Sequence, residues 1–268
     1  PANTKAIRVV MTPGSTWRYS GGGTTIMQLA MVETTGEAFP ALTQRLVLDP
    51  IGMQNSAFEQ PLSKAKEDLA AAGHDDQGKM VDGRWHTYPE LAAAGLWTTP
   101  TDLTKWAIEI AEARAGKSTK TLSQTMAAEM LTVQKAPSGL GPALGNSGDA
   151  LYFQHGGSNE GYSCFVAYFP ALGRGAAIMT NGDAGSVVYR QILNALAKEY
   201  QWPAYQAREI EAVALDASML EQLVGEYPLP AMSPNDTPRS AFITQENGKL
   251  IIEAAQFLAK DEIVLLAN

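Results

Sequence analysis

The sequence predicts an α+β fold in which an antiparallel sheet is flanked by helices. In the first half of the chain, apolar residues recur at helical spacing. After Leu151 the pattern changes to short runs of β-forming residues, which glycine-rich connections join. Another helical stretch follows these runs, and helices before and after a strand meander indicate a layered α+β domain.

The composition is that of a globular chain and excludes several classes of function. The 268 residues carry 20 Lys and Arg against 28 Asp and Glu, a formal charge of −8, without a basic run that would suit nucleic acid. No apolar stretch reaches the roughly 18 residues of a membrane span. A single cysteine excludes an intrachain disulfide, and the three histidines lie far apart, so we expect neither a metal nor another cofactor.

Two helices are predicted near the start of the chain. Residues 24–35 are mostly apolar and predict a buried helix, which Gly36 closes. A second helix over residues 39–48 is expected to stop at Asp49-Pro50, because the residue before a proline is disfavoured in the α region.

The middle of the chain predicts a loop and two further helices. Residues 70–88 alternate turn residues with aromatic ones and predict a hairpin-like excursion. Thr99-Pro100-Thr101-Asp102 predicts a helix start with Thr99 as the N-cap, and Asp102 is interpreted as part of this cap. A helix is also expected over residues 122–131.

The second half of the chain predicts a strand meander and a covering helix. The three antiparallel strands are expected over residues 151–153, 164–169 and 176–179. A helix over residues 187–200 is expected to cover this sheet with one apolar face, formed by Val188, Ile192, Leu193 and Leu196.

The C-terminal part predicts a separate β-rich appendage. A short helix is expected over residues 218–223, followed by two β runs that flank Asn247-Gly248, a strong hairpin signal. We therefore expect a main domain over residues 1–205 and a small, truncated appendage over residues 212–268.

Two short clusters carry the chemistry. Tyr19 and Ser20 precede Gly21-Gly22-Gly23, whose flexibility would let both side chains project into a cleft at a helix start; the alternative is a tight turn in which Tyr19 packs on Trp17. The glycines do not form a phosphate-binding loop, because the required lysine is missing.

The second cluster is His155-Gly156-Gly157-Ser158, expected between two strands. His155 would supply a proton or a hydrogen bond, the glycines would let a substrate lie against the strand edge, and the Ser158 N–H would face an oxyanion. The alternative is an exposed histidine in a turn. The remaining conspicuous residues are interpreted as structural: Cys164 as a buried inert thiol, Trp97 and Trp106 as core, and Asn181 and Asp183 as turn residues.

Five motifs in this order resemble those of the serine β-lactamase and penicillin-binding-protein superfamily, and specifically its class C branch with D-aminopeptidases and esterases. They are Tyr19-Ser20-Gly21 after P-G-x-x-W-x, P-I-G-M at 50–53, A-A-G-L-W-T-T-P-T-D-L at 93–103, H-G-G-S at 155–158 and M-T-N-G-D at 179–183. The resemblance covers residues 10–200. It implies a β-lactamase/transpeptidase-like fold with a helical subdomain and a periplasmic or secreted setting.

The resemblance implies acyl transfer through a serine ester on a β-lactam, a D-amino-acid peptide or an ester. Tyr19 would move the proton as general base and His155 would orient the substrate, with Ser20, Gly21, Gly156, Gly157 and Ser158 as substrate-binding residues. Gly21 departs from the family pattern, which has Asn there. This departure favours an esterase or peptidase over a lactamase.

The nucleophile is the larger departure. In the family an S-x-x-K motif precedes the tyrosine, whereas the single match here, Ser63 to Lys66, follows it in a polar stretch and is interpreted as a chance match. We expect the nucleophile in an N-terminal segment absent from this chain, with that segment or a partner chain covering the surface it leaves open.

Two alternatives to a serine hydrolase of this superfamily were considered. The chain would instead be a catalytically inactive scaffold, or a module that binds peptidoglycan fragments, if Tyr19 and His155 only line a cleft. An α/β-hydrolase is excluded, because the sequence holds no G-x-S-x-G elbow.

Overall fold

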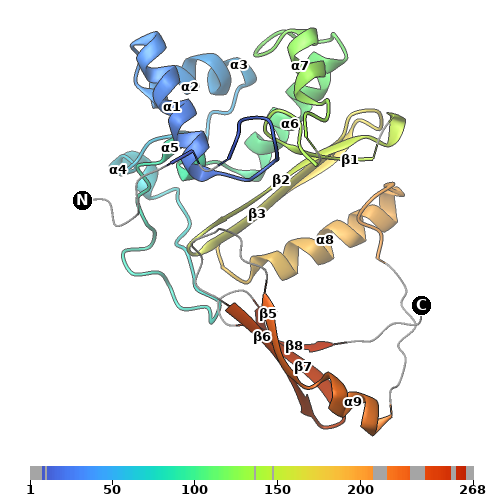
Figure 1. The fold of residues 1–268 in the computed structure, drawn as a ribbon. Coiled ribbons are helices and arrows are strands. Elements are labelled where there is room, and N and C mark those ends of the chain that lie inside the picture. The colour runs from blue at the N-terminus through green and yellow to red at the C-terminus, as the bar shows by residue number, and fades with distance from the viewer. Residues whose placement is uncertain are drawn as a thin grey trace. The chain divides into compact units, whose positions relative to one another are not determined.

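The computed structural model describes residues 8–9, 11–135, 137–146, 148–207, 216–229, 239–254 and 258–263. The chain divides into two compact units, Pro1–Gln206 and Ala207–Asn268 (Figure 1). The first unit is mixed α and β, with an antiparallel sheet flanked by helices, as predicted.

The sheet of the first unit contains, within the described residues, four antiparallel strands in the order β1-β2-β3-β4. They span Ala143–Gly145, Tyr152–Asn159, Tyr162–Phe169 and Arg174–Thr180. The meander is confirmed, but β2 and β3 are longer than predicted and β1 was missed, because its three residues give too short a run for period-2 patterning. A short 3-10 turn at Gly148–Ala150 leads into β2.

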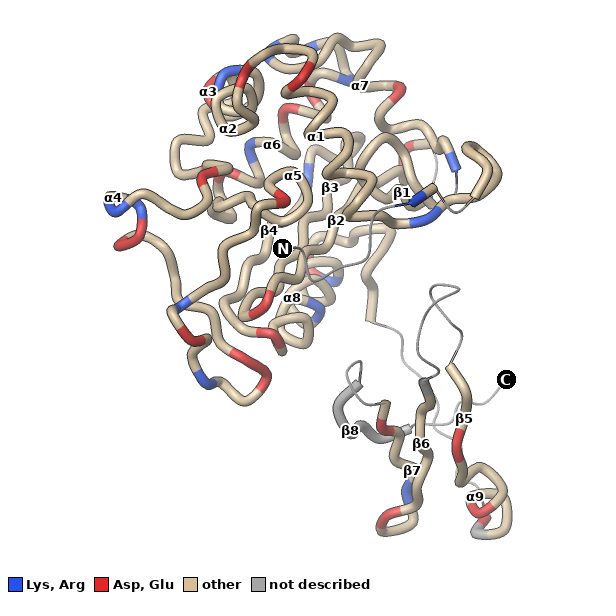
Figure 2. The backbone as a smooth tube through the Cα atoms, turned by 60° about the vertical axis from the view of Figure 1, so that its left-hand side comes forward, with Lys and Arg blue, Asp and Glu red and all other residues tan. Residues whose placement is uncertain are grey.

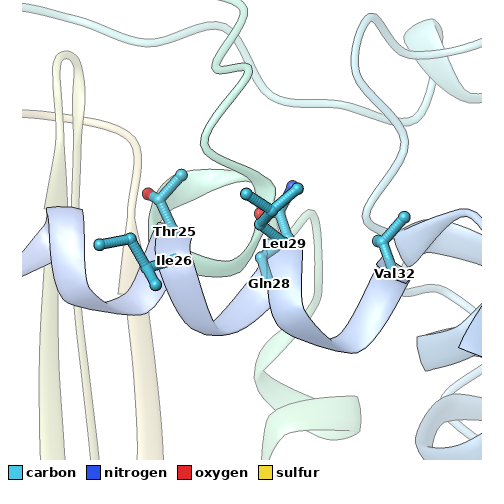
Figure 3. A pocket seen from close by; sticks show the side chains of 5 residues that line it. All are labelled: Thr25, Ile26, Gln28, Leu29 and Val32. Atoms are coloured by element: carbon cyan, nitrogen blue, oxygen red, sulfur yellow. The ribbon is translucent and has the colours of Figure 1, made fainter. Parts of the chain in front are cut away.

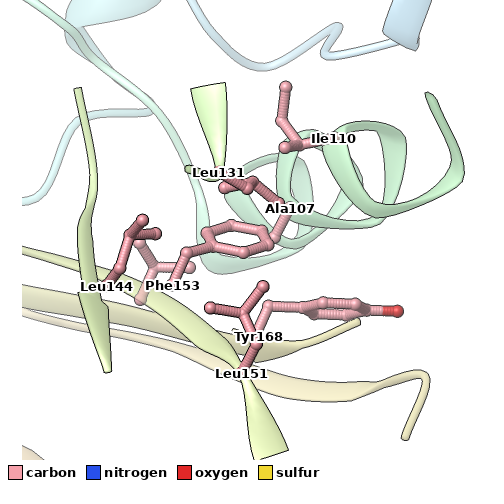
Figure 4. Packing of buried hydrophobic residues seen from close by; sticks show 8 residues of the cluster. Ala107, Ile110, Leu131, Leu144, Leu151, Phe153 and Tyr168 are labelled. Atoms are coloured by element: carbon pink, nitrogen blue, oxygen red, sulfur yellow. The ribbon is translucent and has the colours of Figure 1, made fainter. Parts of the chain in front are cut away.

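One face of the sheet packs against α6 (Pro100–Arg114), and α7 (Gln124–Met130) packs on α6 and reaches the same cluster with its last residue (Figure 4). Phe153 is fully buried there between strands and helix, and Trp106 meets it edge-to-face at 5.9 Å between ring centroids. Trp106 is thus part of the core edge, as predicted. Ser123 caps α7 by accepting a hydrogen bond from the Met126 N–H.

Asp102 anchors α6 rather than capping it. Thr99 is the N-cap, as predicted, and accepts from the Asp102 N–H, but the Asp102 carboxylate is fully buried and turns away from the helix start. It accepts from the Asn55 N–H at 2.8 Å, the Ser56 hydroxyl at 3.0 Å and Lys105 Nζ at 2.8 Å. The cap interpretation of its side chain was wrong, because spacing along a helix does not reveal a partner 47 residues away.

The pKa of Asp102 reflects two opposing effects. Burial raises it, since the charged form loses water, but the hydrogen bonds from Lys105, Asn55 and Ser56 together hold the pKa below its ordinary value. The charged carboxylate therefore stabilises the fold.

The opposite face of the sheet packs against α8 (Gly185–Tyr200) (Figure 1). The helix is confirmed, but its predicted face was partly wrong: Leu193 and Leu196 pack on the sheet, whereas Val188 is 51% exposed and Ile192 is exposed too. The packed stripe continues to Tyr189, which stacks on Phe165. Because Tyr189 to Leu193 is one helical turn, this stripe lies about 100° from the one that Val188 and Ile192 define.

The helix α1 (Gly21–Thr35) corrects two expectations. It begins at Gly21, so the three glycines form its first turn, and Gly36 closes it with a positive φ of 69°, as predicted. The helix was expected to be buried, but none of its residues is, and Leu29 is 57% exposed. Its apolar residues lie all around the axis, and α2 and α5 cover only part of it, which leaves an apolar hollow of about 390 Å³ along Thr25, Ile26, Gln28, Leu29 and Val32 (Figure 3).

The predicted second helix continues past its expected stop. It consists of α2 (Phe39–Thr43), a π-helical segment (Gln44–Leu48) and α3 (Asp49–Ile51), and Gly52 ends it with a φ of 78°. The expected stop at Asp49-Pro50 was wrong, because a proline in the first turn after the widened π segment sacrifices no needed N–H.

Two short helices and a long loop complete the first unit: α4 (Lys64–Glu67), α5 (Leu91–Ala94) and the excursion of residues 70–88. The excursion forms a small hairpin-like turn in which His74 bridges Met80, as predicted.

The second unit contains α9 (Ala217–Leu223) and, within the described residues, four antiparallel strands: β5 (Gly225–Leu229), β6 (Arg239–Glu246), β7 (Lys249–Ala254) and β8 (Leu258–Ile263). The hairpin at Asn247-Gly248 is confirmed, with positive φ at both residues. Among the described residues of both units, no helix is long and apolar enough to span a membrane.

Candidate active site

The first half of the candidate site lies at the start of α1. Ser20 is the N-cap of this helix, and its hydroxyl accepts a hydrogen bond from the Gly23 N–H at 3.0 Å. The residue before it, Tyr19, is 70% exposed and projects from the helix start. The Ser20 hydroxyl is therefore already engaged in a structural bond, while the Tyr19 side chain is largely exposed.

The second half lies on β2. His155, Gly156, Gly157 and Ser158 pair in register with β3, His155 opposite Val166 and Ser158 opposite Ser163. The expectation that this motif connects two strands was wrong, because both glycines lie inside β2. Glycine has a low propensity for strands, and here the hydrogen bonds to β3 hold these residues in the extended conformation.

The structure brings these two halves together. The rings of Tyr19 and His155 lie 6.3 Å apart between centroids, tilted by 40°. Within β2, His155 shares a face with the buried Phe153, so the imidazole lies on the side of the sheet that carries α6. The interpretation of Tyr19 as a side chain packed on Trp17 is not needed, because its described ring neighbour is His155.

One edge of β2 is open along the motif. The short strand β1 pairs with β2 only at Tyr152, Phe153 and Gln154, so among the described residues no strand covers this edge from His155 onward. Strand N–H and C=O groups that β3 does not use face this edge, and an extended substrate can pair with them. Gly156 and Ser158 are exposed on this strand, and their predicted substrate-binding roles stay predictions.

Gly157 is required by its neighbour Cys164. A Cβ atom at position 157 would lie 2.6 Å from the Cys164 Sγ, whereas one at Gly156 would meet Phe165 at an ordinary 3.5 Å. Cys164 is half-buried rather than fully buried as expected, and burial raises the pKa of its thiol, although the Gly157 backbone opposes this. The thiol thus fills the space that a side chain at 157 would need.

Gly21, in contrast, has room for a side chain. A Cβ atom there would meet nothing within 4 Å, so the missing asparagine is not excluded by space. The Ser63 to Lys66 match is placed elsewhere: Lys66 Nζ contacts the Glu59 carboxylate at 2.9 Å, and the Ser63 N–H donates to the same side chain. Lys66 lowers the pKa of Glu59, so the lysine of this match is engaged by a neighbouring carboxylate.

The far end of β2 is fixed by two neighbouring segments. Asn159 Nδ2 donates to the Ala94 carbonyl of α5 at 2.9 Å. The turn after β2 contacts the excursion of residues 70–88, because the His74 N–H donates to the Gly161 carbonyl. The turn after β4 joins both, since Asp183 accepts from the Gly161 N–H and Asn181 donates to the Ala72 carbonyl. Asn181 and Asp183 are thus turn residues, as predicted, that also tie the loop to the sheet.

Few charged side chains lie on the elements of the site. The strands β2 and β3 carry no Asp, Glu, Lys or Arg, and α1 carries Glu33 alone, while most other charges of the first unit lie on its other helices and loops (Figure 2). A lysine from a distant part of the sequence contacts the segment that precedes Tyr19. Lys135 Nζ donates to the carbonyls of Gly14 at 2.8 Å and Ser15 at 2.9 Å.

Sequence reasoning missed Asn159 and Lys135. Asn159 directly follows the glycine motif, so its position was a usable signal. Lys135 gives no such signal, because 120 residues separate it from the turn that it contacts.

The comparisons with known proteins concern the fold and the family of the chain. The crystal structure of SurE superposes with a TM-score of 0.61 at 21% identity, covering 97% of this chain and 61% of that one. The octameric penicillin-binding protein homologue from Pyrococcus abyssi gives 0.61 at 20% identity, covering 96% and 57%. These similarities show a shared fold.

Among curated proteins, the Unguisins hydrolase ungD of Aspergillus violaceofuscus (strain CBS 115571) is 29% identical over 103 residues, which is 35% of this chain and 18% of that protein. The chain thus spans only part of the length of the proteins it matches. The profile of the Beta-lactamase family matches residues 2–199, which include both halves of the site. The chain belongs to the Beta-lactamase family.

Proposed function

We propose that this chain is the larger part of a serine hydrolase that forms an acyl-enzyme with a β-lactam, a D-amino-acid peptide or an ester. The observation that carries the proposal is the approach of Tyr19 to His155 at the open edge of β2. A phenol and an imidazole beside a strand edge offer proton transfer and substrate alignment at one place.

Each residue has a role in this proposal. Tyr19 moves the proton between nucleophile and leaving group, and His155 orients the substrate. Gly156 and Gly157 admit the substrate to the strand edge, and the Ser158 N–H stabilises the oxyanion of the tetrahedral intermediate. Ser20 fixes the helix start from which Tyr19 projects.

We also propose that the nucleophile comes from a segment outside this chain, or that a partner covers the same surface. The single S-x-x-K match is engaged elsewhere. Among the described residues, the outer edge of β4 has no strand partner, and Leu29 of α1 and Val188 of α8 are apolar and exposed. Open strand edges and apolar helix faces are surfaces that proteins normally cover.

Names of similar proteins support the range of substrates. SurE has also been crystallised with D-Leu, and the curated relative is a hydrolase of unguisins. On the basis of these two names, we propose a D-amino-acid compound or a peptide as the substrate of this protein. The periplasmic or secreted setting likewise stays a prediction.

The test is covalent labelling of the full-length protein with a fluorescent penicillin and a fluorophosphonate. We expect an adduct on the full-length protein and none on the 268-residue chain, since the nucleophile lies outside it. An adduct on the 268-residue chain itself would contradict the external nucleophile.

Two variants of the full-length protein, Tyr19→Phe and His155→Ala, test the proposed roles of these residues. Both side chains are exposed, so neither change should unfold the protein, and both should slow labelling at least about tenfold. The absence of an adduct on the wild-type full-length protein would favour the alternative, a scaffold or peptidoglycan-fragment binding module.

A further inference from the structure

The segment that carries Tyr19, residues 11–20, is held by little packing. Residues 12–20 are all exposed, and Met11 is half-buried. Within the segment, the Ser15 N–H and hydroxyl both bond the Thr12 carbonyl, which closes a local turn but does not attach it to the domain. Its position beside β2 therefore depends on a small number of polar contacts.

Lys135 supplies the long-range attachment. Its ammonium group lies 2.8 Å from the Gly14 carbonyl and 2.9 Å from the Ser15 carbonyl, so one cation holds two adjacent peptide groups of the turn. The loop that carries Lys135 is itself fixed, because the Ser138 N–H bonds the Lys135 carbonyl and Ser138 is buried. Charge-assisted bonds of this kind are stronger than neutral ones.

We propose that Lys135 is a positioning residue, which holds residues 11–20 so that Tyr19 stays beside His155. This proposal rests on the proposed function for its catalytic consequence, but not for its structural one. At the other end of the segment, the Ser20 cap fixes the start of α1. Lys135 and Ser20 thus restrain the chain on both sides of Tyr19.

The structural test is cleavage by trypsin at Arg18, which is exposed and lies inside this segment. In Lys135→Met the initial rate of cleavage at Arg18, followed by mass spectrometry, should rise about threefold to tenfold, because the local opening becomes more populated. Lys135→Arg should stay near the wild-type rate, since its guanidinium can donate to both carbonyls.

The matched control is Lys120→Met, which removes another exposed lysine that forms no described hydrogen bond with residues 11–20. It should leave cleavage at Arg18 unchanged. Equal rates in wild type and Lys135→Met would overturn the proposal, as would an equal rise in Lys120→Met.

The catalytic test uses the full-length protein and the labelling probe. Lys135→Met should lower the maximal acylation rate about threefold to tenfold with little change in the half-saturating probe concentration, and Lys135→Arg should restore it. An unchanged acylation rate would overturn the positioning role. If wild type does not react at all, the proposed function fails, and cleavage at Arg18 alone still decides whether Lys135 holds the segment.

Discussion

The two halves of the candidate site are held in place by different interactions. The strand half, β2, combines a continuous ladder to β3 with the buried core under Phe153. The helix half, α1 with residues 11–20, has no buried side chain in the described structure and depends on hydrogen bonds such as those of Lys135 and Ser20. Stability should therefore be sensitive to changes on the strand half, and alignment of the site to changes on the helix half.

The largest difference is expected between Phe153→Ala and Leu29→Ala. Phe153 is fully buried, so its truncation should lower the free energy of unfolding by about 3–5 kcal/mol. Leu29 is 57% exposed, and its truncation should cost less than about 1 kcal/mol. Urea unfolding measures both, and equal losses would show that α1 is covered in solution.

Asp102→Asn tests the anchor of the helix that supports β2. The change keeps the shape but removes the charge that Lys105 and the Asn55 N–H compensate, so we expect a loss of about 2–3 kcal/mol at pH 7. Ser123→Ala removes only the N-cap of α7 and is the control for the loss of one local hydrogen bond. It should lower the free energy of unfolding by about 1 kcal/mol.

The pH dependence of this loss has a definite sign. The pKa of Asp102 is lowered in the folded protein, so its charge stabilises the fold above the unfolded pKa, which is about 3.9. That contribution disappears as the pH falls through the folded pKa. The difference between wild type and Asp102→Asn should therefore shrink below about pH 4, and a difference that grew on acidification would contradict the assignment.

A smaller effect should separate the two glycines of the strand half. Gly157→Ala pushes a methyl group into the Cys164 Sγ and should cost about 1–3 kcal/mol, whereas Gly156→Ala finds ordinary contact distances. The double variant Gly157→Ala with Cys164→Ala should recover part of the loss, because the shorter side chain makes room. Thermal unfolding measures this recovery. If the double variant is no more stable than Gly157→Ala, the loss comes from the backbone conformation at position 157 and not from the contact with Cys164.

The fold was predictable where local signals and tertiary contacts agree. Thr99 acts through its hydroxyl on a backbone N–H three residues on, and Gly36 and Asn247-Gly248 act through their own backbone. All three signals are local, so their sequence positions sufficed for the cap, the helix end and the hairpin. The helix α1 was predicted to be buried because its residues are apolar, but burial depends on what packs against it. Pro50 was misjudged for a similar reason, since a π-helical segment changes which N–H groups are needed.

The site was predictable as a set of residues but not as a geometry. The sequence order of the motifs identified Tyr19 and His155, whose approach depends on a strand and a helix 136 positions apart in the chain. The glycine motif was expected between two strands, because glycine disfavours strands in isolation and only the pairing with β3 overrides this. The restraint by Lys135 arises from tertiary structure alone.

The smallest change in stability is expected for Gly21→Asn on the helix half. The position is the first residue of α1, where a side chain meets nothing within 4 Å, so the free energy of unfolding should change by less than about 0.5 kcal/mol.

Gly21→Asn is best tested by the selectivity of the protein between the two labelling probes. In the full-length protein, an added amide beside Tyr19 can donate to a substrate's amide carbonyl, so labelling by penicillin should rise relative to labelling by fluorophosphonate. Gly21→Ala, which fills the same space without an amide, is the control and should leave the ratio unchanged. An equal ratio in both variants would mean that a side chain at position 21 does not reach the substrate, and that the helix half selects substrates through Tyr19 alone.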